Sequence, residues 1–130
     1  GLFCDADKVA AELSSGRRPV LDARSAPRFA GLEPEPRAGL RSGHMPGALN
    51  LPFGQLQLEG KMKSAAELRA EFARVLGEQQ APIFSCGSGV TACILALGAE
   101  LAGYQGLTVY DGSWSEWGAD ARRPVVGSRD

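Results

Sequence analysis

Residues 82–103 read PIFSCGSGVTACILALGAELAG, and this stretch decides the fold. The short apolar run from Pro82 to Ser85 predicts a buried strand. The segment from about Val90 to Ala102 predicts a helix, with Gly103 as its stop signal. Strand, loop and helix in that order are typical of a parallel α/β sheet, in which ligands bind at the carboxyl ends of the strands. We therefore expect Cys86 to stand at such an end, in the loop before a helix.

The rest of the chain repeats this alternation of short apolar runs and longer amphipathic segments. Further strands are expected at Pro19–Asp22, Ala48–Pro52 and Leu107–Tyr110. Helices are expected from Asp5 or Asp7 to about Ser14, from Ser25, from the capping box Ser64–Glu67 to Gly77, and from a second capping box, Ser113–Glu116. The pattern predicts an α/β domain with a mainly parallel sheet.

Length and charge restrict the class of protein. A chain of 130 residues is one domain's worth of sequence, and the residues from about Val125 are expected to form a frayed tail. Fourteen basic and fifteen acidic residues give a net charge of −1, so we expect no nucleic-acid partner. The longest mostly apolar stretch contains Glu100 and is too short to cross a bilayer, so we expect no membrane partner.

The three cysteines and one histidine narrow the chemistry further. Three cysteines cannot form a closed disulfide framework, which favours a reducing compartment; we expect the cytoplasm, with mitochondria left open. A single histidine and no CxxC pair argue against a structural zinc site, and we expect no metal and no cofactor. His44 is expected to pack or to form a hydrogen bond, and Cys93 to lie in the core.

The loop after the central strand is the candidate reactive site. Gly87 and Gly89 allow the backbone N–H groups to turn inward and hold an anion, and the following helix dipole adds to that field. Such surroundings favour a thiolate on Cys86. The alternative, a small buried apolar cysteine, is weakened by the two glycines and the helix start beside it. Cysteine-dependent phosphatases need an arginine six positions after the nucleophile, where this chain has Ala92. Phosphatase activity is therefore not expected.

Several motifs together resemble the rhodanese superfamily. They are DAR (22–24), Arg28-Phe29, EPEPR (33–37), GHMPGALN (43–50), CGSGVT (86–91) and YDGSWSEW (110–117). They cover the chain from about Val9 to Trp117 in the family's order, and most resemble the C-terminal, catalytic domain of 3-mercaptopyruvate sulfurtransferases. The resemblance implies a single rhodanese domain over residues 1–130, with a central five-stranded sheet and helices on both faces.

The resemblance also implies an activity and its residues. Cys86 would accept sulfur from 3-mercaptopyruvate as a persulfide, release pyruvate, and pass the sulfur to cyanide or to a thiol such as a thioredoxin-like protein. Ser88 would help to move the proton, while the cradle would comprise Gly87, Gly89, Val90 and Thr91. Arg28 and Arg37, nine residues apart like the family's substrate-binding arginines, would hold the donor; otherwise they are ordinary surface residues.

The loop sequence separates the alternatives. Thiosulfate sulfurtransferases resemble Cys-Arg-Lys-Gly-Val-Thr there, and their cations suit a dianionic donor, whereas this chain has neutral residues at 87 and 88. A thiosulfate-using or sulfur-carrier rhodanese and a non-catalytic binding module remain alternatives. Family members with this loop usually carry an N-terminal rhodanese domain, absent from this chain, whose aspartate and histidine face the loop serine. Asp22 and Arg24 are expected to form a structural ion pair, and Trp114 and Trp117 to lie in the core or at a domain interface.

Overall fold

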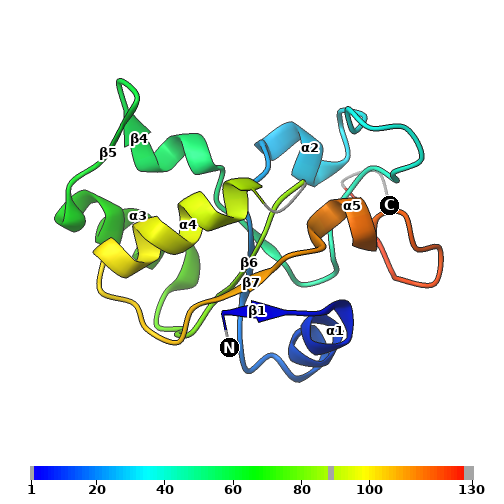
Figure 1. Ribbon diagram of the computed structural model, residues 1–130, viewed down its shortest axis with the longest axis horizontal. Helices are drawn as coiled ribbons and strands as arrows, with labels where there is room; N and C mark the ends of the chain where they lie inside the picture. Colours follow the sequence, from blue (N-terminus) through cyan, green and yellow to red (C-terminus); the bar gives the residue numbers. More distant parts are fainter. Residues whose placement is uncertain (1, 88–89, 128–130) are drawn as a thin grey trace.

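A five-stranded sheet forms the centre of the molecule (Figure 1). The computed structural model describes residues 2–87 and 90–127. The strands are β1 (Phe3–Cys4), β2 (Val20–Asp22), β3 (Leu49–Asn50), β6 (Ile83–Ser85) and β7 (Thr108–Tyr110). In the described residues they lie in the order β1-β7-β6-β2-β3, and every neighbouring pair is parallel. The predicted parallel α/β fold is therefore confirmed.

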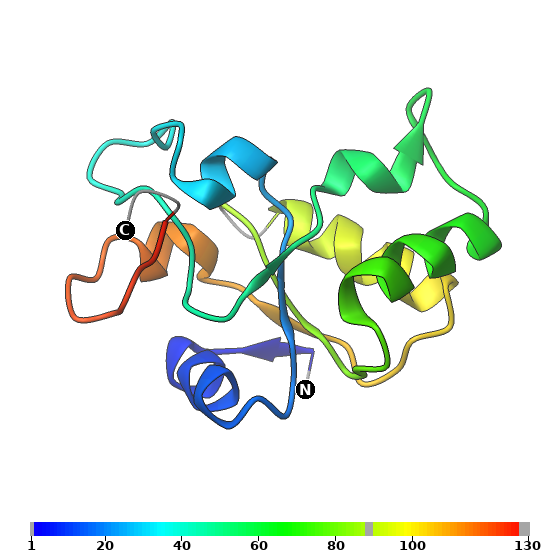
Figure 2. The same cartoon turned by 180° about the vertical axis from the view of Figure 1, so that it is seen from behind.

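Helices cover both faces of this sheet, as Figures 1 and 2 show. They are α1 (Ala6–Ser15), α2 (Ala26–Ala30), α3 (Ala65–Leu76), α4 (Val90–Leu101) and α5 (Ser113–Trp117). A 3-10 helix, η1 (Phe53–Leu56), and a small antiparallel hairpin, β4 (Gln57–Leu58) with β5 (Lys61–Met62), precede α3. The buried side chains of α3 and α4 form one hydrophobic cluster with Leu21 and Phe84. Those of α1 and α5 form a second cluster with Val20 and Ile83. Alternate strand residues thus point to opposite layers, as expected for a sheet buried on both faces.

The predicted helix ends are confirmed for α1 and α3. The Asp5 carboxylate accepts a hydrogen bond from the Lys8 N–H at 2.9 Å, and α1 ends at Gly16 with a φ of 71°. At α3 both capping-box bonds between Ser64 and Glu67 are present, each at 3.2 Å. Local side-chain chemistry therefore sets these helix ends.

The second predicted capping box is wrong. Gly112 is the N-cap of α5, and Ser113 is its first residue. The Ser113 hydroxyl donates to the Tyr110 carbonyl at 2.8 Å and accepts from the Cys86 N–H, while the Glu116 carboxylate accepts from the Tyr110 hydroxyl at 2.6 Å. Both side chains have partners on other segments, and these replace the reciprocal cap.

Three further features differ from expectation. Cys93 is exposed, because α4 buries the face that carries Ala92, Leu95 and Ala99. Val126 forms an antiparallel bridge with His44, through hydrogen bonds of 2.8 and 2.9 Å, so the expected frayed tail does not begin at Val125. Residues 128–130, the rest of that expected tail, lie outside the described residues. The edge strand β1 was not expected, since two residues are too few to give a periodic signal.

Candidate active site

Cys86 directly follows β6, at the carboxyl end of the central strand. Its side chain is buried, and its N–H donates to the Ser113 hydroxyl at 3.0 Å. The same hydroxyl lies 3.8 Å from the Cys86 sulfur. The Trp114 N–H donates to the Cys86 carbonyl at 2.8 Å, so the start of α5 fixes both sides of this residue. The sequence-predicted nucleophile thus stands where the strand, the loop and α5 meet.

A cavity of about 360 Å³ lies at the loop that follows Cys86, over the carboxyl ends of the strands; Cys86 itself is 0% exposed and is not part of the wall. Its wall includes four of the residues singled out from the sequence: Arg28, Arg37, Gly87 and Thr91. Phe53 and Ser115 also line it, and sequence reasoning missed them. The Val90 side chain, 70% exposed, is not part of this wall. Ser88 and Gly89 lie outside the described residues, and the chemical roles of all these residues stay predictions.

Glu35 holds Arg28 against the loop. Two hydrogen bonds, at 2.7 and 3.3 Å, join the Arg28 guanidinium to the Glu35 carboxylate. The pKa of Arg28 is raised, chiefly by this hydrogen bond, so the side chain is a permanent cation. A Cβ atom placed on Gly87 would lie 2.9 Å from Arg28 Nη2. A side chain at position 87 would therefore require the end of the flexible Arg28 side chain to shift.

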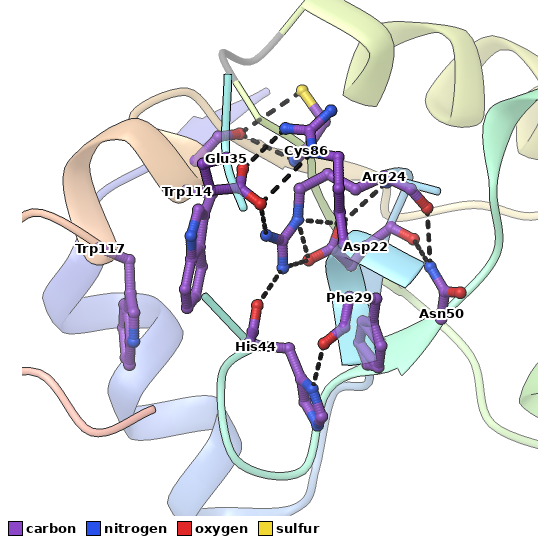
Figure 3. Close-up of polar contacts among 12 residues, drawn as sticks. Asp22, Arg24, Phe29, Glu35, His44, Asn50, Cys86, Trp114 and Trp117 are labelled. Carbon is purple, nitrogen blue, oxygen red and sulfur yellow. Dashed lines mark hydrogen bonds and ion pairs between the residues drawn. The ribbon is translucent and has the colours of Figure 1, made fainter. Parts of the chain in front are cut away.

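Behind Arg28, a buried chain of alternating charges leads back to β2. Arg24 donates to Asp22 at 2.8 Å and to Glu35 at 3.1 Å, and all three side chains are at most 2% exposed. Figure 3 shows these contacts joining Asp22, Arg24 and Glu35. Arg24 also donates to the Gly43 carbonyl at 2.7 Å and lies 4.4 Å from the Trp114 ring centroid. The predicted Asp22–Arg24 ion pair is confirmed.

Sequence reasoning noticed the loop of residues 33–37 but missed the role of Glu35 itself. The signal available was a glutamate between two prolines, two positions before Arg37. That pattern does not reveal burial. The exposed fraction of the Glu35 side chain, 0%, depends on the arginines that enclose it.

His44 has the structural role expected of it. Its Nδ1 atom lies 2.7 Å from the Phe29 carbonyl, and the two rings stack at 3.8 Å (Figure 3). Trp114 and Trp117 are buried, as the sequence predicted. These residues stabilise the loops around the site.

Residues 2–87 and 90–127 hold neither a group of metal-ligating side chains nor a membrane-spanning helix. No three His, Cys, Asp or Glu side chains there are grouped so that they could hold a metal ion. Over the same residues, no helix is both long and apolar enough to span a membrane.

The fold and the site together define a class of protein. The rhodanese-like domain family matches residues 5–120, and the chain belongs to that family. Among curated proteins, it is similar to human 3-mercaptopyruvate sulfurtransferase, at 46% identity over 118 residues, covering 89% of this chain and 40% of the human protein. Rat thiosulfate sulfurtransferase is 46% identical over 114 residues, covering 85% of this chain and 38% of the rat protein.

Solved structures agree with this assignment. The Tum1 protein of Saccharomyces cerevisiae superimposes with a TM-score of 0.83 at 32% identity, covering 98% of this chain and 47% of Tum1. The chain spans about 40% of the length of the curated relatives that it matches. The human and rat relatives are named for different sulfur donors, yet each is 46% identical to this chain. The percentage identity therefore does not distinguish the two donors, and only the residues of the site can.

Proposed function

We propose that this chain is the catalytic domain of a sulfurtransferase that takes sulfur from 3-mercaptopyruvate onto Cys86. One observation carries the proposal: Cys86 at the end of β6 immediately precedes Gly87, which lines a cavity whose wall also includes Arg28 and Arg37. A nucleophile, space for a small molecule and two cations for its acidic end are thus combined at one place.

The transfer needs no external oxidant or reductant. The Cys86 thiolate attacks the donor sulfur, a sulfur–sulfur bond forms, and the carbon–sulfur bond of mercaptopyruvate breaks. Its electron pair leaves with carbon as the enolate, which takes up the proton of the donor thiol and becomes pyruvate. The resulting persulfide is an anion, which the backbone N–H groups of a glycine-rich loop would stabilise. An acceptor thiol or cyanide then removes the outer sulfur.

The loop charge favours this donor over thiosulfate. Residues 86–91 contain no arginine or lysine, so the loop itself places no cationic side chain next to the sulfur. Mercaptopyruvate carries its carboxylate at the end far from its sulfur, and Arg28 and Arg37 are placed on the wall to meet it. Thiosulfate is the second candidate donor, because rat thiosulfate sulfurtransferase is 46% identical to this chain.

The acceptor and the partner domain are part of the same proposal. A small thiol, cyanide or a thioredoxin-like protein would take the sulfur, in the cytoplasm. An N-terminal rhodanese domain would supply the aspartate and histidine that face Ser88 in the family. The proposal therefore includes weak turnover of mercaptopyruvate by this chain alone, even though Cys86 can still accept sulfur.

Mass spectrometry tests the first transfer. The chain is incubated separately with mercaptopyruvate and with thiosulfate, and its mass is measured without reductant. We expect a gain of one sulfur atom from mercaptopyruvate, retained in Cys93→Ser and lost in Cys86→Ser. A gain from thiosulfate alone would establish the second candidate instead. No gain from either donor, with Cys86 reduced and the chain folded, would indicate a binding module.

A further inference from the structure

We propose that Glu35 determines donor specificity: its buried carboxylate balances the charge of the cavity so that a monoanionic sulfur donor is preferred to a dianionic one. The inference rests on the proposed function, since it concerns which donor reaches Cys86. It assigns to Glu35 a role that the resemblance to other rhodaneses did not suggest.

The position of Glu35 allows it to act in this way. It lies on the cavity wall, yet its side chain is 0% exposed, because Arg24 and Arg28 enclose it. The carboxylate receives hydrogen bonds at 2.7 Å from Arg28 and at 3.1 Å from Arg24. In the described part of the chain, Arg37 is exposed and makes no ion pair. Of the three arginines on the wall, Arg24 and Arg28 are thus paired with Asp22 and Glu35, and Arg37 is left available.

The charges around the cavity then sum to zero when Cys86 is ionised. The positive groups are Arg24, Arg28 and Arg37, and the negative groups are Asp22, Glu35 and the Cys86 thiolate. The loop residues 87–91 carry no ionisable side chain, so they do not alter this balance.

A balanced site discriminates between donors by their charge. A monoanion can pair with Arg37 and with the edge of Arg28 that does not face Glu35. Arg28 and Arg37 together with Glu35 carry a net charge of about +1, which is enough to balance one negative charge on the donor. A dianion brings a second negative charge that has no free cation, next to a thiolate in a partly desolvated cavity. Removal of the Glu35 charge would supply that missing positive charge.

Two variants separate charge from position. Glu35→Gln keeps the size of the side chain and one acceptor but removes the charge, whereas Glu35→Asp keeps the charge and shortens the side chain. The rate at which Cys86 gains sulfur is measured by rapid-quench mass spectrometry, with each donor at limiting concentration. We expect the thiosulfate-to-mercaptopyruvate rate ratio to rise about tenfold in Glu35→Gln and to change less than about twofold in Glu35→Asp.

Each outcome has a distinct meaning. An unchanged ratio in folded Glu35→Gln, or an equal change in both variants, would overturn the role of the Glu35 charge while leaving the proposed function intact. Absence of sulfur transfer in the wild-type chain from both donors would contradict the proposed function itself.

A second measurement needs neither sulfur transfer nor a stable variant. Pyruvate and sulfate, a monoanion and a dianion, are compared for protection of wild-type Cys86 from alkylation by iodoacetamide. We expect half-protection at a pyruvate concentration at least about tenfold below that of sulfate, at constant ionic strength. Protection by sulfate at equal or lower concentration would overturn the inference.

Discussion

At the scale of single residues, the site depends on contacts to Cys86 and its neighbour. Ser113 joins Cys86 to β7, since its hydroxyl accepts from the Cys86 N–H and donates to the Tyr110 carbonyl. Its φ of 50° lies in the left-handed region that non-glycine residues rarely adopt, so the chain holds this serine in a strained conformation. The need to place a hydroxyl beside Cys86 explains why a serine stands there instead of glycine.

Replacement of Ser113 tests that explanation. Ser113→Ala should lose about 1–3 kcal/mol of unfolding free energy, because the buried Cys86 N–H loses its acceptor. Ser113→Gly removes the same hydroxyl but relieves the φ, so we expect it to be the more stable variant in urea unfolding. Both should gain sulfur at Cys86 about tenfold more slowly. Wild-type transfer rates in both variants would show that the hydroxyl serves stability alone.

Replacement of Gly87 tests the space reserved for Arg28. Gly87→Ala places a methyl group against Arg28 Nη2, so the guanidinium must shift relative to Glu35. We expect the half-saturating mercaptopyruvate concentration for sulfur transfer to Cys86 to rise about tenfold, the value of one strong hydrogen bond. Gly54→Ala is the matched control, since a Cβ there meets nothing within 4 Å. Equal affinity in both variants would contradict the steric argument.

At the scale of secondary structure, helix ends are set by short local patterns, whereas helix faces are set by the sheet. The Ser64–Glu67 box closes the start of α3 with two hydrogen bonds and lowers the pKa of Glu67 below 4.5, chiefly through the hydrogen bond with Ser64. Because that pKa is depressed in the folded state, the stabilising effect is present above about pH 4.5 and is lost as the pH falls through the folded value.

A variant without this cap should show that pH dependence. Ser64→Ala should lower the unfolding free energy by about 1 kcal/mol at pH 7. Unfolding followed by circular dichroism at pH 7 and pH 3 measures the difference from wild type. We expect the difference to shrink as the pH falls and Glu67 becomes protonated. A constant difference across this range would mean that the carboxylate charge contributes nothing to the cap.

At the scale of the whole molecule, Arg24 connects segments that are distant in sequence. Its guanidinium contacts Asp22 on β2, Glu35 in the loop after α2, the Gly43 carbonyl and the Trp114 ring on α5. Asn50 on β3 donates to the carbonyls of Asp22 and Arg24, which adds the edge of the sheet to this network. One buried polar network, centred on Arg24, therefore connects the cavity wall to the edge of the sheet.

Loss of Arg24 should consequently affect stability and site together. Arg24→Met leaves Asp22 and Glu35 without their shared cation, and we expect a loss of about 3–5 kcal/mol of unfolding free energy. Arg74→Met, which removes a surface pair with Glu71, should cost less than about 1 kcal/mol. Denaturant unfolding of both variants measures the contrast. Similar losses in the two would mean that burial of the network adds no stability.

The sequence predicted most helix ends and, except for β1, the strands of the sheet. These features follow from local rules: apolar runs, capping patterns and glycines at turns. The chemical roles assigned to the residues of the candidate site stay predictions. Cys93 and the pair Ser113–Glu116 were assigned wrongly, because their surroundings are set by other segments.

What the sequence determined by itself was the alternation of the main strands and helices, since it depends on neighbours within a few positions. The tertiary structure alone decided which charges meet. Glu35 becomes buried only when α2, the loop after it and β2 bring two arginines around it, and Ser113 reaches Cys86 only because β6 and β7 are adjacent in the sheet. Electrostatic contacts depend on distance in space, which the order of residues along the chain does not specify.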